Sequence, residues 1–133
     1  MYKFREERGF TLLEVIVVVV IVGVALPSLF ILIGNVSYGS FRNKLMNNAV
    51  NIASSRLEQV QAFKDENWDW YKTITKFEED ETLADGFTRK TEVEHFEDWE
   101  STGYEAYGVT VTVGHQKLDD AYQVTIYLTK YSR

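Results

Sequence analysis

The sequence predicts an α+β protein in which a long N-terminal helix packs against a small antiparallel sheet of three to four strands. Three patterns support this fold class: an apolar run at residues 10–33, helically spaced apolar residues at positions 45–63, and strict alternation in two segments near the C-terminus. With 133 residues, 26% of them charged and 14% aromatic, the composition is that of one small folded domain preceded by an anchor.

Residues 1–9 are short and charged. Their three bases, Lys3, Arg5 and Arg8, stand against Glu6 and Glu7, so the segment carries a net charge of +1. It lacks the apolar centre of an ordinary secretory signal, because the apolar run begins only after it. We therefore expect residues 1–9 to be a leader peptide.

Residues 10–33 carry one charge, that of Glu14. As a helix they span about 36 Å, against a hydrocarbon core of about 30 Å. Their β-branched residues suit a strand, but a lipid-embedded segment must satisfy its backbone internally, which favours a helix. We expect a single-pass membrane helix with the C-terminus outside, since the leader is positive. A kink or local melting is expected from Gly23 to Pro27, because proline removes a backbone donor.

Residues 34–66 extend this helix with an amphipathic half. Apolar residues recur at spacings of four and three, and others widen the stripe; the two sets are Met46, Val50, Ala53, Leu57 and Val60, and Leu45, Ala49, Ile52 and Phe63. We expect a sheet to fold on this stripe. A coiled coil is the alternative, although little more than two heptads is short for one.

Residues 67–133 are expected to form a globular head built on a β-sheet. Residues 107–114 alternate, with Val109, Val111 and Val113 on one face, and residues 121–129 repeat the alternation. The polar residues 115–120 connect these two strands as a hairpin. Residues 88–96 read as a charged edge strand, and residues 67–86 as a loop with at most one short helix.

The head carries all of the excess negative charge. Residues 67–133 hold fourteen acids and seven bases, a net charge of -7, and ten of these acids fall within residues 77–100. Such a surface repels phosphates, so we expect no direct nucleic-acid binding. A solvated face explains the acidic run; a basic partner or a cation site is the alternative. The chain has no cysteine, so no disulfide stabilises the exported head.

No residue pattern predicts catalysis, a cofactor or a metal. Asp65, Asn67 and Asp69 have the spacing of a calcium loop, but Trp70 replaces the required glycine and Lys76 the bidentate glutamate. The two histidines, His95 and His115, stand apart from any nucleophile motif and are expected at the surface. The aromatic residues Trp68, Trp70, Tyr71 and Trp99 are expected in the core, with a stacking platform for a glycan or a partner as the alternative.

The hexapeptide at residues 9–14, Gly9, Phe10, Thr11, Leu12, Leu13 and Glu14, resembles the class III signal of the type IV pilin and type II secretion pseudopilin superfamily. The resemblance implies a pilin-like fold, cleavage by a prepilin peptidase between Gly9 and Phe10, and methylation of the new Phe10 amine. It makes Phe10, Thr11 and Glu14 assembly residues, with Glu14 pairing with the N-terminal amine of a neighbouring subunit. The alternative is a Glu14 that snorkels to the interface from an ordinary anchor.

The resemblance also implies partners and a location. The partners are the prepilin peptidase, other pilins or pseudopilins and the membrane; the location is the cytoplasmic membrane, then a cell-surface or periplasmic filament. Ala49, Ala53, Leu57 and Glu58 resemble, more weakly, minor pilins or pseudopilins of the PilV and GspI kind. We expect a minor structural subunit. Alternatives are a competence pseudopilin of a DNA-uptake machine, a filament-tip adhesin, and an anchored sensor that keeps residues 1–9.

Overall fold

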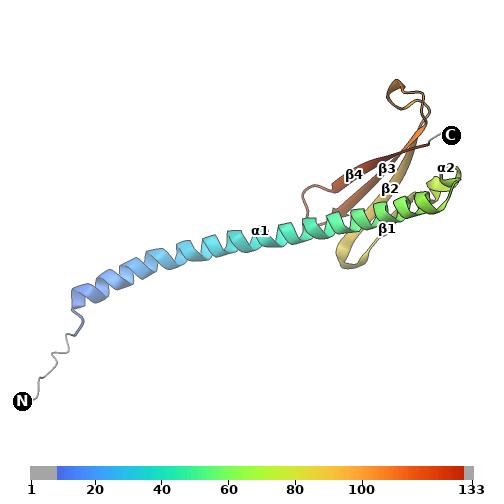
Figure 1. Ribbon diagram of the computed structural model, residues 1–133. Coiled ribbons are helices and arrows are strands. Elements are labelled where there is room, and N and C mark those ends of the chain that lie inside the picture. Colours follow the sequence, from blue (N-terminus) through green and yellow to red (C-terminus); the bar gives the residue numbers. More distant parts are fainter. Residues whose placement is uncertain (1–8, 131–133) are drawn as a thin grey trace, which may run out of the picture. The chain divides into compact units, whose positions relative to one another are not determined.

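The computed structural model describes residues 9–130; most of the predicted leader, residues 1–8, and residues 131–133 lie outside the described part. The chain divides into two compact units, Met1–Ser40 and Phe41–Arg133, each of which is described by itself. The α-helices are α1 (Leu12–Glu66) and α2 (Trp70–Thr73), and the strands are β1 (Glu79–Thr82), β2 (Phe87–Phe96), β3 (Ala106–His115) and β4 (Tyr122–Thr129), as Figure 1 shows. Three short 3-10 helices lie between them, at Ile74–Phe77, Ala84–Gly86 and Trp99–Ser101. The predicted α+β fold class is confirmed.

Helix α1 is continuous over 55 residues, with Pro27 inside it. The predicted extension of the membrane segment into an amphipathic helix is therefore confirmed, but the local melting expected from Gly23 to Pro27 is not found. Pro27 removes only one intrahelical hydrogen bond, and an apolar segment offers its backbone no partners outside the helix. The neighbouring Ser28 hydroxyl donates to the Val24 carbonyl at 3.1 Å.

The first unit exposes its apolar surface. Every side chain from Phe10 to Tyr38 is exposed in the monomer, including the long run of valine, leucine and isoleucine side chains. By its length and composition, α1 can cross a membrane once. An apolar surface of this size needs lipid or other protein around it.

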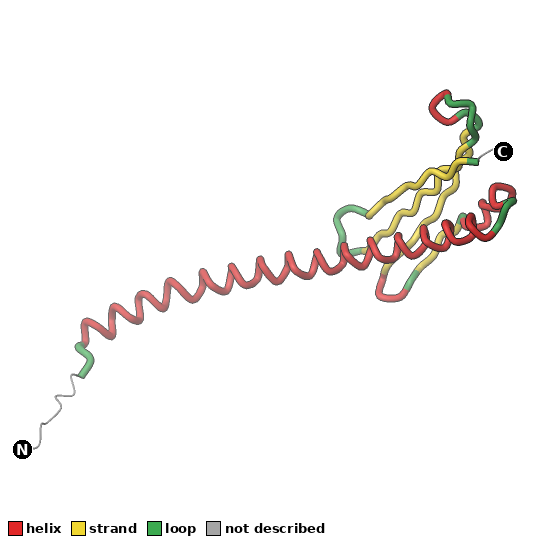
Figure 2. The backbone as a smooth tube through the Cα atoms, viewed as in Figure 1, coloured by secondary structure: helices red, strands yellow, loops and turns green. Residues whose placement is uncertain are grey.

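The second unit is built on a four-stranded antiparallel sheet in the order β1-β2-β3-β4 (Figure 2). Strands β3 and β4 are the predicted hairpin. The expectation that residues 88–96 form an edge strand is wrong, because β2 pairs with β1 on one side and with β3 on the other. The true edges are β4 and the short β1, which lies inside the segment predicted as a loop.

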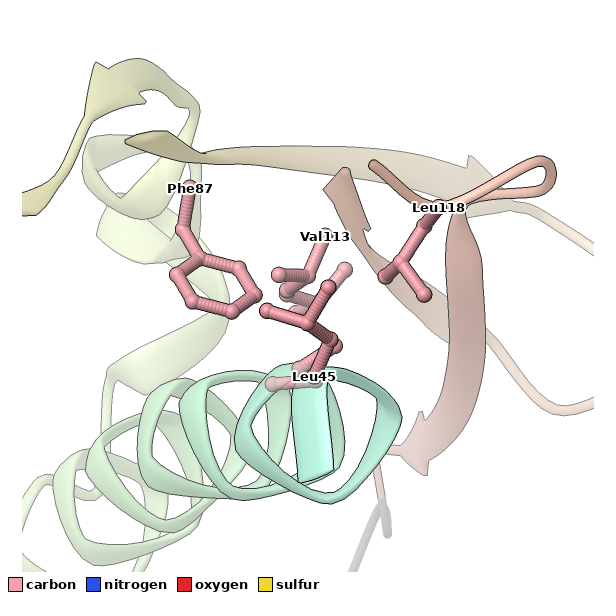
Figure 3. Close-up of a cluster of buried hydrophobic side chains, with 7 residues drawn as sticks. Leu45, Phe87, Val113 and Leu118 are labelled. Atoms are coloured by element: carbon pink, nitrogen blue, oxygen red, sulfur yellow. The ribbon is translucent and has the colours of Figure 1, made fainter. Parts of the chain in front are cut away.

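Side chains on one face of the sheet pack against residues 45–63 of α1. One cluster joins the helix to the ends of β2 and β3 (Figure 3): Leu45, Ala49, Ala53, Phe87, Val111, Val113 and Leu118. A second cluster lies towards the C-terminal end of α1: Val60, Trp70, Ile74, Val109 and Leu128. The inward positions predicted for β3 are confirmed.

The predicted helix stripe is right in position but rotated slightly. The fully covered line on α1 runs through Leu45, Ala49, Ala53 and Val60, whereas Met46, Ile52 and Leu57 pack at its margin. Alanine at the centre lets the backbones approach closely, which is why the small residues are covered best.

The two histidines differ in their surroundings. His95 is exposed, as predicted. His115 is half-buried against the Phe87 ring, at a centroid distance of 4.6 Å. The Lys117 N–H donates to His115 Nδ1 at 3.0 Å, so Nε2 carries the proton and donates to the Asp85 carbonyl at 2.9 Å. His115 therefore ties the β1–β2 turn to the β3–β4 connection.

Candidate functional site

The predicted processing site lies directly before α1. Gly9, Phe10 and Thr11 are outside the helix and exposed, and Phe10 exposes 76% of its surface. Within residues 9–130, no atom other than those of its chain neighbour lies within 4 Å of the position that a Cβ would take on Gly9. The peptide bond between Gly9 and Phe10 is thus in an open, non-helical segment, the conformation that a peptidase can bind.

Thr11 caps the start of the helix. Its hydroxyl Oγ1 accepts the backbone N–H of Glu14 at 3.2 Å, and its carbonyl accepts the N–H of Val15 at 3.1 Å. A threonine followed three residues later by glutamate is the spacing of a capping box. This role for Thr11 was missed in the sequence, although the Thr-x-x-Glu spacing carries the signal.

Glu14 lies on the first turn of α1, where the helix dipole favours a negative charge. Its side chain is exposed, and among residues 9–130 the carboxylate takes part in no hydrogen bond or ion pair. A carboxylate this close to a lipid-length apolar run is costly without a partner. The structure places Phe10 and Thr11 directly before α1 and Glu14 in its first turn, where the Glu14 N–H is bonded to the Thr11 hydroxyl.

A buried ion network in the second unit was also missed in the sequence. Arg56, on the sheet-facing side of α1, pairs with Glu81 on β1. Its Nη2 also lies 3.5 Å from Oε2 of Glu79. Arg89 on β2 binds the same Glu81 carboxylate through Nε at 2.7 Å and Nη2 at 3.0 Å. The Arg89 hydrogen bonds hold the pKa of Glu81 below its usual range, and Arg56 adds to this effect.

The network fastens the edge strand to the helix. The Arg56 and Arg89 side chains are only 9% and 11% exposed, so their charges depend on Glu81 for neutralisation. In the sequence, Arg56 lies three residues after Ala53, on the apolar face of the helix. This position could have indicated a buried arginine. The partner carboxylates could not be chosen from an acidic run of ten.

The residues considered for a metal are used otherwise. Asp65 accepts from Gln61, Asn67 donates to the Phe63 carbonyl at 2.9 Å, and Asp69 pairs with Lys72 at 3.0 Å. Over residues 9–130, no group of three or more histidine, cysteine, aspartate or glutamate side chains is placed to hold a metal ion. These three side chains are thus engaged with neighbours along the chain.

The four aromatic residues do not form one platform. Trp70 is buried and packs edge-on against Tyr107, and Tyr71 lies beside it. Trp99 is half-buried and tilts over Tyr127 at a centroid distance of 4.2 Å. Trp68 alone is largely exposed, at 76%. The prediction of core positions therefore holds for Trp70 and fails for Trp68, which sits in the turn after α1.

Comparison with known proteins identifies the N-terminal segment. Residues 4–26 match the family described as the prokaryotic N-terminal methylation motif. This match covers the open Gly9–Phe10 bond, the Thr11 cap, Glu14 and the first half of the exposed apolar helix. No curated protein and no solved structure matches the chain. Over these residues, the match supports the predicted resemblance to the type IV pilin and type II secretion pseudopilin superfamily.

Proposed function

We propose that this chain is a structural minor subunit of a type IV pilus or of a type II secretion-like filament, inserted in the membrane and assembled through its N-terminal helix. The observation that carries the proposal is the methylation motif at residues 4–26, placed at the head of a helix whose apolar surface is exposed from Phe10 to Tyr38. Lipid covers this surface before assembly, and neighbouring helices cover it in the filament.

We assign residues 1–9 as the leader, 10–33 as the membrane and assembly helix, 34–66 as its amphipathic extension and 67–133 as the head. Cleavage after Gly9 leaves Phe10 as the first residue, and methylation of its amine follows. The open segment before Leu12 supports this assignment, because a peptidase must bind residues on both sides of the bond in an extended form.

Cleavage changes the electrostatics of the helix start. It creates a cationic amine on Phe10, next to the positive end of the helix dipole, which is an unfavourable place for a cation. The Glu14 carboxylate of a neighbouring subunit neutralises that charge. The same pairing lowers the free-energy cost of placing the carboxylate in an apolar environment. Thr11 contributes by fixing the first turn, so that the Glu14 side chain leaves the helix in a defined direction.

The test is the mass of the mature chain. In cells with a working prepilin peptidase, we expect the membrane-extracted protein to begin at methylated Phe10, and Gly9→Ala to slow or block the cut. A conservative change in the head, Lys72→Gln, serves as the control, since Lys72 is exposed and remote in sequence from the cut. A mature chain that keeps residues 1–9 contradicts the proposal and favours an anchored, uncleaved protein.

A filament-tip binding module is the second candidate function. It is favoured by one observation, the 76% exposure of the Trp68 side chain, because large exposed aromatic side chains often mark binding sites. Trp68→Ala should abolish such binding while processing and assembly persist. Equal surface adhesion by cells carrying this variant would contradict an adhesive role for Trp68.

A further inference from the structure

The two edges of the head sheet are protected very differently. Strand β1 has four residues, Glu-Asp-Glu-Thr, and its acids deter pairing with another strand. Strand β4 has eight residues, Tyr-Gln-Val-Thr-Ile-Tyr-Leu-Thr, without a charge, a proline or a glycine. No strand within residues 9–130 lies on its outer side. A long uncharged edge is a template for strand addition.

The hydrogen-bond pattern shows which backbone groups β4 offers. The Lys130 N–H donates to the Glu105 carbonyl at 3.0 Å, just beyond the last pair in the β3–β4 register. Because hydrogen-bonded and non-hydrogen-bonded pairs alternate in an antiparallel ladder, the even-numbered residues of β4 bond to β3. The N–H and C=O groups that point outward therefore belong to Gln123, Thr125, Tyr127 and Thr129.

The side chains of β4 are also incompletely covered. Tyr122, Val124 and Ile126 face α1 but are only half-buried, in contrast to the fully buried valines of β3. A strand added beside β4 would cover this apolar row and pair the outward backbone groups at the same time. Its own side chains must be apolar on the α1 side and polar on the outer side.

A second copy of this chain does not meet these requirements. Two β4 strands paired antiparallel run residues 41–66 of α1 in opposite directions, so residue 41 lies at opposite ends of the pair, whereas the proposed function has both chains leave the same membrane. Paired in parallel, the α1-facing side of one sheet adjoins the outer face of the other, so apolar rows meet polar ones. The β1 edge of a second copy would set Glu79 and Glu81 against Val124 and Tyr122 and desolvate them.

We propose that β4 is the docking edge for an uncharged strand supplied by a different subunit of the same membrane system. The contrast in charge between the two edges carries this choice of partner, because an acidic strand cannot pair beside the apolar row. The inference rests on the proposed function only for the common direction of the membrane anchors. It assigns the head a role in choosing a specific neighbour, separate from the role of the N-terminal helix.

The test uses the full-length chain in the membranes of cells that carry the filament system. The photo-reactive amino acid p-benzoylphenylalanine replaces Gln123, which is exposed on the outer side of the edge. We expect a cross-link to a different protein, within a segment that carries no acidic residue. Thr125→Pro removes one outward N–H without touching the β3–β4 ladder, and it should lower the yield about fivefold or more.

Two matched variants separate the edge from other causes. Thr125→Ala removes the side chain but keeps the N–H, and Asp80→Pro removes an outward N–H from the β1 edge, since Leu83 N–H bonds to the Phe87 carbonyl on the inner side. Both should leave the cross-link unchanged. A cross-link to a second copy of this chain, or one that Thr125→Pro leaves at full yield, overturns the proposal, as does equal loss with Asp80→Pro.

Amide hydrogen exchange on the unaltered chain gives a test that needs no variant to fold. The outward amides of Gln123, Thr125, Tyr127 and Thr129 should exchange quickly in detergent and at least about tenfold more slowly in native membranes. Equal exchange in both, or the absence of any cross-link, overturns the proposal. The N-terminal mass of the same sample shows whether processing after Gly9 has failed as well, which distinguishes this failure from that of the proposed function.

Discussion

Substitutions at different members of the buried ion network should lower the stability of the protein by different amounts. Glu81→Gln removes the one carboxylate that Arg56 and Arg89 share, and leaves two guanidinium groups with side chains 9% and 11% exposed. Arg56→Met removes one cation, keeps most of the buried stem, and leaves Glu81 with both of its Arg89 hydrogen bonds. The acid should therefore matter far more than the helix arginine.

The magnitudes follow from the burial. Breaking a buried pair so that charge is left unneutralised costs about 3–5 kcal/mol. Glu79 remains 3.5 Å from Arg56 but is 55% exposed, so we expect the lower end, about 3 kcal/mol, for Glu81→Gln. Arg56→Met should cost only about 1 kcal/mol, the net value of one hydrogen bond, because Glu81 keeps both Arg89 hydrogen bonds and no buried charge is left unneutralised. Arg56 Nε is buried and has no hydrogen-bond partner in residues 9–130. Replacing Arg56 by Met removes this unsatisfied donor, which also favours a small cost.

Urea and thermal unfolding of a soluble fragment beginning at Ser37 measure these values, since both core clusters lie within residues 45–128. For a domain of this size, about 3 kcal/mol lowers Tm by roughly 12–24 °C. Arg89→Met is the matched control for loss of the second cation. Equal costs for Glu81→Gln and Arg56→Met, or a cost below about 1 kcal/mol for Glu81→Gln, would refute the reasoning.

The same network predicts an acid-dependent loss of stability. The pKa of Glu81 is lower in the folded state than its ordinary value, chiefly because Arg89 donates hydrogen bonds to the charged form. The stabilisation is therefore complete above the unfolded carboxyl pKa of about 4.3 and is lost as the pH falls through the lower folded value. Glu81→Gln should remove this part of the pH dependence, and an unchanged acid profile would contradict it.

Three further predictions concern assembly, the core and a turn. Glu14→Val should keep membrane insertion but abolish co-purification with sheared filaments, since valine eases insertion and only the pairing is lost; wild-type co-purification would exclude the pairing role. Val111→Asp should cost several kcal/mol by burying an unpaired carboxylate, whereas Thr112→Asp on the outer face should stay within about 1 kcal/mol, and similar melting curves would contradict the packing. Gly86→Ala should cost about 1–2 kcal/mol, because Gly86 has φ +81° and a Cβ would lie 3.3 Å from His115 Nε2; an unchanged Tm would count against the turn.

Local patterns carried most of the fold prediction. The alternation around Val111 predicted which side chains of β3 face the core. The helical spacing near Ala53 predicted which side of α1 packs against the sheet. Each of these signals repeats within a few residues, because a strand turns over every two residues and a helix about every 3.6. Strand β1 was hidden, since a four-residue acidic segment has no apolar alternation to reveal it.

The candidate site divides in the same way. The residues proposed for cleavage and assembly, Gly9, Phe10, Thr11 and Glu14, lie within six consecutive positions, so a motif could identify them. Arg56, Glu81 and Arg89 are separated by 25 and 8 residues in sequence, and no periodicity connects them. The helix cap formed by Thr11 could have been predicted from the sequence, because it depends only on the three-residue spacing between Thr11 and Glu14.

The sequence by itself determined the membrane-length helix, the processing motif and the types of the main secondary-structure elements, because each depends on residues that are neighbours along the chain. Only the tertiary structure decided that β2 is internal, that the exposed uncharged edge is β4, and that a buried arginine fastens β1 to the helix. Strand order and ion pairing depend on which distant segments share one side of α1, and the free energy of that choice is a property of the packed head as a whole.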